Sequence, residues 1–135
     1  MSEIMLVNNE YITMKYLVDI EVIYHTIHRP MSDQPLRDAL LKGFNALRIY
    51  GVCKWVSDDR KNGPMTPEDR EWGMVNLNQR AMEAGWKYWA LVAPSEVVAA
   101  GSLFPTMTAL QELGLRMAVF SDLEEAFAWI EPLDC

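Results

Sequence analysis

The feature that most constrains the fold is an alternation of helical and strand patterns in the last two thirds of the chain. Three short segments at 52–57, 86–93 and 115–120 are almost continuously apolar, and the segments between them show helical spacing. Strands that are apolar on both faces are typical of a parallel sheet covered by helices. The pattern therefore predicts three parallel strands joined by helical crossovers.

The first third of the chain has a different pattern. Segments 3–8, 11–16 and 21–27 mix β-branched and aromatic residues with polar ones, and Asn8 and Asn9 mark a turn. This pattern predicts an antiparallel meander on the same sheet. We therefore expect one α/β domain over residues 1–135, with a single mixed sheet flanked by about four helices. The meander leaves a strand edge, so both a monomer and a homodimer through that edge or an adjacent helix remain open.

Residues that begin and end helices mark the crossovers. Pro35 suits a first helical turn and Gly51 a left-handed stop. Thr66 is the expected cap of the next helix, which ends at Gly85. A stripe at helical spacing supports the first helix: Leu36, Leu40, Leu41, Phe44 and Leu47.

The last two helices have their own signals. The helix after the second apolar strand is expected to be disturbed around Gly101 and Pro105. Ser121 and Glu124 have the spacing of a capping box, which predicts a closing helix.

Charge and cysteine content exclude several classes of function. Twelve Lys and Arg against nineteen Asp and Glu give a net charge of -7. Nucleic-acid binding and anionic membrane surfaces are therefore disfavoured, because both need clustered cations. With no apolar run of about 18 residues and no secretory leader pattern, we expect a cytoplasmic chain that is not an integral membrane protein. Cys53 is expected to be a small core residue. Because Cys135 is the only other cysteine, no disulfide and no zinc site are expected, and no cofactor is expected either.

The candidate site is the edge of the sheet where the parallel strands end. In such sheets, ligands gather at the carboxyl ends of strands, beside helix starts. Three such corners contain the candidate residues for a partner or ligand: Ser57, Asp58, Asp59, Arg60, Lys61, Ser95 and Ser121. The loop that holds most of them separates strand from helix by about ten residues, which is long for a crossover. We expect it to be ordered from Ser57 to Arg60 and mobile near Gly63.

Four of the seven candidates also have a purely structural interpretation, whereas helix capping does not explain Ser57. Ser95 and Ser121 can be plain helix caps. Asp58 and Asp59 can be solvated or paired with Arg60 rather than bind a cation. Arg60 and Lys61 can hold a phosphate or a partner's carboxylate.

Catalysis and metal binding are not expected. His25 and His28 are three apart in a strand, so their side chains diverge and cannot share a metal. There is no G-x-S-x-G motif, although a pairing of Ser57 with His25 across the sheet stays open. The five tryptophans are mostly core, and alternatively they line an apolar cavity for a lipid-like ligand: Trp55, Trp72, Trp86, Trp89 and Trp129.

Several stretches together resemble a known family. "KWVSDDRK", "PEDREW", "AGWKYWALVAP" and "VFSDLEEAFAWI" make the chain similar to small bacterial STAS-like proteins. That family is related to the anti-sigma-factor antagonist domain and is often grouped with the SEC14-type lipid-binding domain. The resemblance spans nearly the whole chain. It implies a helix-flanked sheet without catalysis.

The resemblance also suggests a regulated serine. In antagonist domains a serine after a central strand is phosphorylated to switch partner binding, and Ser57 is the matching position. The family's Asp-Ser-Ser/Thr-Gly hallmark is absent here, and neighbouring Asp58 and Asp59 would repel a phosphate. The leading hypothesis is a non-enzymatic, regulatory protein-binding module with a protein or anionic partner. The alternative is a carrier of a small apolar molecule or lipid.

Overall fold

The computed structural model describes residues 2–63 and 65–135 and contains one six-stranded sheet in the order β1-β2-β3-β4-β5-β6. Its first three strands are antiparallel, and β3 to β6 are parallel. This arrangement confirms the predicted α/β fold with a mixed sheet. The strands are Glu3–Asn8, Ile12–Leu17, Val22–Ile27, Lys54–Asp58, Tyr88–Val92 and Arg116–Phe120.

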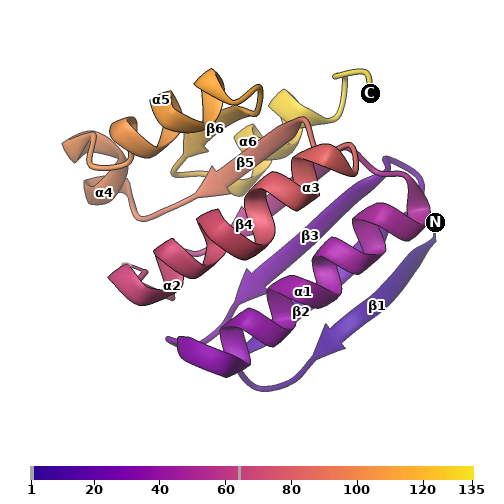
Figure 1. Cartoon of the computed structure of the whole chain (residues 1–135), viewed down its shortest axis with the longest axis horizontal. Helices are drawn as coiled ribbons and strands as arrows, with labels where there is room; N and C mark the ends of the chain where they lie inside the picture. Colours follow the sequence, from indigo (N-terminus) through magenta and orange to yellow (C-terminus); the bar gives the residue numbers. More distant parts are fainter. Residues whose placement is uncertain (1, 64) are drawn as a thin grey trace.

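Helices cover both faces of the sheet. Figure 1 shows α1, α2 and α3 crossing one face, with α6 behind β5 on the other. In chain order the helical elements are α1 (Asp33–Tyr50), α2 (Pro67–Gly73), the π-helical segment η1 (Met74–Asn78), α3 (Gln79–Glu83), α4 (Ser95–Ala100), α5 (Phe104–Glu112) and α6 (Leu123–Ile130). The break between α4 and α5 falls where Gly101 and Pro105 predict it.

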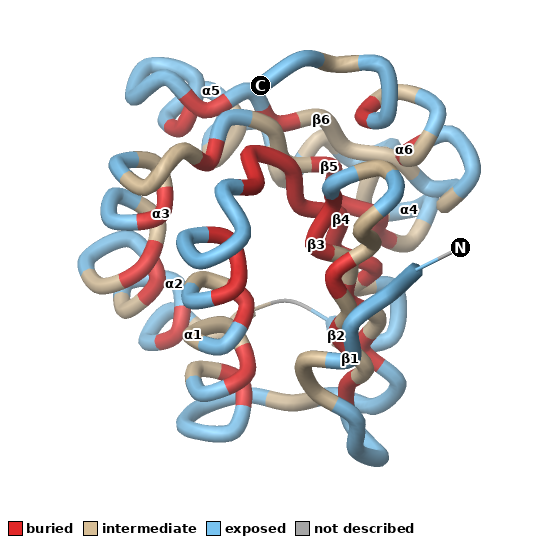
Figure 2. The backbone as a smooth tube through the Cα atoms, turned by 90° about the vertical axis from the view of Figure 1, so that its right-hand side faces the viewer, coloured by how far each residue is buried: buried red, intermediate tan, exposed pale blue. Residues whose placement is uncertain are grey.

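Alternation along the strands divides the core into two clusters. Trp55 belongs to the cluster beneath α1, α3 and α5, whereas its neighbour Val56 belongs to the cluster beneath α6. Figure 2 shows the backbone of β3, β4 and β5 as mainly buried, and β1 as mainly exposed. The parallel strands are thus covered on both faces, as their apolar sequences predict.

The first crossover helix lies unusually close to the sheet at Gly43. A Cβ atom added at Gly43 would lie 2.7 Å from Cζ2 of Trp55 and 3.0 Å from Sδ of Met14. Both side chains are buried in the same cluster. Gly43 is therefore required by the packing of α1 on the indole of Trp55.

The expected helix ends are mostly confirmed. Thr66 accepts a hydrogen bond from the backbone N–H of Asp69, and Gly51 adopts φ 66°. Pro35 is the third residue of α1 rather than the first, because the helix begins at Asp33. The helix expected from Thr66 to Gly85 contains the π-helical turn η1, which the apolar pattern does not reveal.

The expectation of two unpaired cysteines is wrong. Cys53 is buried and forms a disulfide with Cys135, 82 residues away, with a Cα–Cα distance of 5.7 Å. The ammonium of Lys87 donates to the carbonyl of Cys135 (2.7 Å), and that of Lys54 donates to the carbonyl of Glu131 (2.9 Å). These contacts hold the last residues against the amino ends of β4 and β5. Sequence spacing could not show this, because the pairing depends on where the last helix returns the chain.

The outer strand of the meander is irregular. The pairing register of β1 with β2 shifts between Met5 and Val7, which is a bulge at the sheet edge. Bulges of this kind hinder further strand pairing. Whether the chain is a monomer or a homodimer stays a prediction. Within residues 2–63 and 65–135, no helix has the length and apolar character needed to cross a bilayer.

Candidate functional site

The three strand-end corners lie side by side along one edge of the sheet. The backbone N–H of Asp59 after β4 donates to the carbonyl of Val92, and that of Ala93 after β5 donates to the carbonyl of Phe120 (both 2.9 Å). The parallel register places the ends of β4, β5 and β6 at this same edge. The predicted gathering of these corners is thus present, although the serines do not share a common environment.

Ser57 does not lie on the exposed rim where we expected it. It is 3% exposed, and its hydroxyl accepts a hydrogen bond from the indole Nε1 of Trp89 (2.9 Å). Strand β4 continues to Asp58, so Ser57 is still within the strand and points toward the α1 side of the sheet. A kinase could reach this hydroxyl only after the end of β4 opened.

Asp58 points to the opposite face and is tied to Arg60. Its carboxylate is buried and accepts two bonds from the guanidinium, from Nε (2.9 Å) and from Nη2 (2.8 Å). Burial alone would raise the pKa of Asp58, but the side-chain and backbone hydrogen bonds from Arg60, with its charge, hold that pKa below its usual value. The alternative in which Asp58 pairs with Arg60 is therefore confirmed.

Asp59 is joined to a buried histidine rather than to solvent alone. Its carboxylate accepts from Nε2 of His25 (2.8 Å), and Nδ1 of His25 accepts from the indole Nε1 of Trp55 (3.0 Å). Both ring nitrogens are thereby engaged, which the tautomer with its proton on Nε2 satisfies. His25 is the register partner of Ser57, yet no nitrogen is left to act as its base. The Ser57–His25 pairing is therefore not assembled.

The loop after Asp59 is fixed at its base and charged at its surface. The side-chain oxygen of Asn62 accepts from the backbone N–H of Met31 (2.8 Å), and the backbone N–H of Asn62 donates to the carbonyl of Asp59 (3.0 Å). Arg60 and Lys61 are exposed. The expected mobility near Gly63 stays a prediction, and the following Pro64 lies outside the described residues.

The two other serines are exposed at this edge, but neither caps a helix. Ser95 is the first residue of α4, and the preceding Pro94 forms no side-chain cap. At α6 the cap is Asp122, whose carboxylate accepts from the N–H of Glu124 (3.1 Å), so the predicted capping box from Ser121 is wrong by one residue. Because an anionic side chain already occupies the start of α6, an anion from solvent is disfavoured there.

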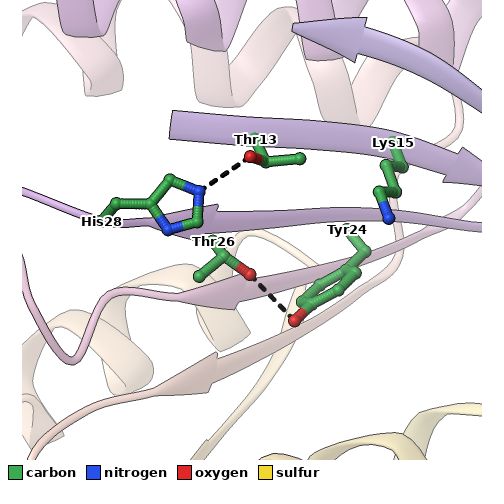
Figure 3. Close-up of a pocket in the computed structure, with 5 residues that line it drawn as sticks. All are labelled: Thr13, Lys15, Tyr24, Thr26 and His28. Carbon is green, nitrogen blue, oxygen red and sulfur yellow. Dashed lines mark hydrogen bonds between the residues drawn. The ribbon is translucent and has the colours of Figure 1, made fainter. Parts of the chain in front are cut away.

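A shallow pocket missed by sequence reasoning lies beside this edge, on the face of the meander opposite α1. Figure 3 shows its five lining residues, and its volume is about 270 Å³. Thr26 is paired in register with Asp58, which places the pocket next to the Asp58–Arg60 pair. The only sequence signal was the alternation of polar residues in β2 and β3. The lining residues are Thr13, Lys15, Tyr24, Thr26 and His28.

Hydrogen bonds already engage most polar groups of this pocket. Thr26 donates to the hydroxyl of Tyr24 (2.8 Å), and Thr13 is hydrogen-bonded to Nε2 of His28 (2.7 Å). The ammonium of Lys15 forms an ion pair with Glu3 (3.1 Å). Most polar groups of the pocket therefore already have a hydrogen-bond or ion-pair partner within the protein, on an open face of the sheet. His28 lies on this face whereas His25 is buried on the other, so the two imidazoles diverge as predicted.

The tryptophans pack mainly against one another. Ring centroids are 5.8 Å apart for Trp55 and Trp86, and 5.5 Å apart for Trp86 and Trp89. Trp55 and Trp86 are buried as expected, whereas Trp89 is half-buried. A second pocket lies between α1 and α2. None of the three tryptophans lines this pocket or the pocket on the meander. Among the described residues, no three acidic, histidine or cysteine side chains form a potential metal site.

Comparisons with known proteins add no identification: no protein-family model matches the chain, and no curated protein or solved structure is significantly similar to it.

Proposed function

We propose that this chain is a non-enzymatic, regulatory protein-binding module of STAS-like type. Its contact surface is the loop of residues 59–63. The observation that carries the proposal is the construction of this loop. Its base is tied to the sheet and to the chain before α1, while Arg60 and Lys61 remain exposed.

Such a construction favours binding to a partner. Loops lose conformational entropy when they are ordered, and a loop ordered in advance avoids part of that cost at the moment of association. Exposed cationic side chains on this loop suit an acidic group of a partner protein. Lys61 is better placed for this than Arg60, because the Arg60 guanidinium is already engaged by Asp58.

The regulatory part of the proposal concerns Ser57. A phosphate on its hydroxyl would break the bond from Trp89 and would place negative charge within a buried strand end. Modification would therefore rearrange the base of the loop. In this form, the serine acts as a switch beneath the contact surface and not as a contact residue.

The carrier alternative has less support. A lipid-like ligand needs a connected apolar cavity of roughly 300 Å³ or more. The ring centroids of Trp55, Trp86 and Trp89 instead lie within 6 Å of their neighbours, and every residue that lines the open pocket on the meander bears a polar group. Native mass spectrometry of the chain purified from its own host tests this alternative, because a carrier would retain a small apolar molecule.

The binding proposal is tested by comparing two single substitutions in a capture experiment. Immobilised wild-type chain, the Lys61→Glu variant and the Lys42→Glu variant are incubated with host extract, and the retained proteins are quantified. Lys42 is an exposed lysine of α1 outside the loop, so it controls for the change in net charge. We expect a protein retained by wild type and Lys42→Glu but lost with Lys61→Glu. Equal retention by both variants would show that the loop is not the contact surface.

A further inference from the structure

A second surface, separate from the loop, lies where α1 meets α2 and η1. It forms an open groove of about 310 Å³ on the helical layer. We call it the α1–α2 groove. Its lining residues are Arg37, Glu68, Glu71, Trp72, Val75 and Asn76.

The base of the groove is held in place by a buried carboxylate. Asp69 is 3% exposed and accepts bonds from Nε of Arg37 and from the backbone N–H of Asp33, both at 2.9 Å. The guanidinium of Arg37 in turn lies 5.6 Å from the ring centroid of Trp72. Arg and Trp are the residues that most often dominate binding energy at protein interfaces. Here both are positioned before any partner arrives, which lowers the entropic cost of binding.

The π-helical turn shapes one wall of the groove. The side-chain amide of Asn76 donates to the carbonyl of Trp72 (3.1 Å), at the junction of α2 and η1. On this wider turn Val75 is 68% exposed and Met74 is 38% exposed. The apolar surface inside the groove is therefore that of Val75 and of the half-buried Trp72, because Met74 is not among the lining residues. Covering them would gain roughly 25 cal/mol for each Å² removed from water.

Charge around the groove indicates the kind of partner. The side chain of Asp33 is 83% exposed, and Glu68 and Glu71 are also exposed. The positive charge of Arg37 is balanced by the buried carboxylate of Asp69, to which it is paired at 2.9 Å. The exposed charges that line the groove are therefore acidic, and the net charge of -7 adds to the attraction of a cation over longer range.

We propose that the α1–α2 groove docks a basic amphipathic segment of another protein. Apolar side chains of that segment cover Trp72 and Val75, and its Lys or Arg side chains pair with Glu68 and Glu71. This surface uses neither Lys61 nor the loop of residues 59–63, so the inference stands or fails separately from the proposed function.

The test is a titration of ¹⁵N-labelled chain with a synthetic amphipathic helix of Leu and Lys, about 14 residues long. A matched peptide with Glu in place of Lys is the control ligand. We expect the Leu/Lys peptide alone to shift the indole N–H of Trp72 and the amides of residues 72–76 in a saturable manner. Equal binding of the Leu/Glu peptide, or shifts scattered over other surfaces, would overturn the proposal.

Variants of the chain separate specific docking from general attraction to an acidic protein. The double variant Glu68→Lys/Glu71→Lys should lower the affinity for the Leu/Lys peptide by about tenfold or more. Glu112→Lys/Glu124→Lys, on exposed parts of α5 and α6, makes the same charge change elsewhere and should weaken it much less. Equal weakening by the two pairs would mean that only net charge matters and would overturn the proposal.

The Val75→Asp variant tests the apolar part of the docking and the identity of the occupant. It should weaken peptide binding while leaving the thermal unfolding midpoint nearly unchanged, since Val75 is 68% exposed. Sedimentation equilibrium is measured on the same variant. If wild type is a dimer and Val75→Asp is a monomer, a second copy occupies the groove and the proposal of a basic partner is wrong.

Discussion

The two halves of the sheet differ in how their faces are covered. Strands β4 to β6 are parallel, covered by helices on both faces, and contain the indoles of Trp55 and Trp89. The meander of β1 to β3 is covered by α1 on one face, while the other bears half-buried polar groups such as Thr13 and Lys15. Stability is therefore expected to reside mainly in the parallel half, and exposed polar chemistry mainly at the meander and the strand ends.

The charged corner consists of Asp58, Asp59 and Arg60. It lies at the seam between the two halves, where β3 pairs with β4. Thr26 of β3 is in register with Asp58 of β4, and His25 is in register with Ser57. On one face the seam holds the pair of Asp58 with Arg60, and on the other it holds the bond of His25 with Asp59. A loop at such a seam can be rigid at its base because strands from both halves contact it.

The largest effect is expected from Trp55→Ala in the covered half. It removes a buried indole beneath Gly43 and leaves Nδ1 of His25 without its donor. The loss should be about 4 kcal/mol in the free energy of unfolding. Urea unfolding of wild type and variant measures it. A loss below about 1 kcal/mol would contradict the assignment of stability to this half.

The second effect concerns the disulfide that ties the last residues to the start of β4. Cys135→Ser removes the link to Cys53, which closes a long loop. We expect a loss of about 3 kcal/mol in the free energy of unfolding. The same loss should appear when wild type is reduced, and reduction should leave the Cys135→Ser variant unaffected. If reduction also destabilises the variant, the effect does not come from this bond.

Acid sensitivity tests the seam itself. The pKa of Asp58 is lowered in the folded state, because hydrogen bonds from Arg60 outweigh the effect of burial. A lowered folded pKa contributes stability above the ordinary value of 3.8, and this contribution is lost as the pH falls through the folded pKa. When the pH is lowered from about 5, the free energy of unfolding should fall less steeply with pH for Asp58→Asn than for wild type. Equal slopes would show that the Asp58–Arg60 pair is not formed.

The smallest effect is expected on the open face of the meander. Lys15→Ala removes a partly exposed ion pair with Glu3 and exposes little apolar surface. The free energy of unfolding should change by less than about 0.5 kcal/mol. A loss comparable to that of Trp55→Ala would show that this face is covered in solution. Sedimentation equilibrium would then identify a homodimer as the cover.

Local patterns along the chain were enough to determine the strand positions, the mixed sheet and most helix ends. This is because runs such as 52–57 and residues such as Thr66 and Gly51 act through their immediate neighbours. They also located the charged corner at the carboxyl edge, since parallel strands must end together there.

Only the tertiary structure decided which of those polar residues face solvent and which are buried. Ser57 and Asp58 differ by one position, yet a strand that ends one residue later than expected buries both and points them to opposite faces. The pairing of Cys53 with Cys135 and the Arg37–Asp69 link beneath the α1–α2 groove join residues 82 and 32 positions apart. Spacing along the sequence does not specify such distances, because they depend on how the helices return the chain over the sheet.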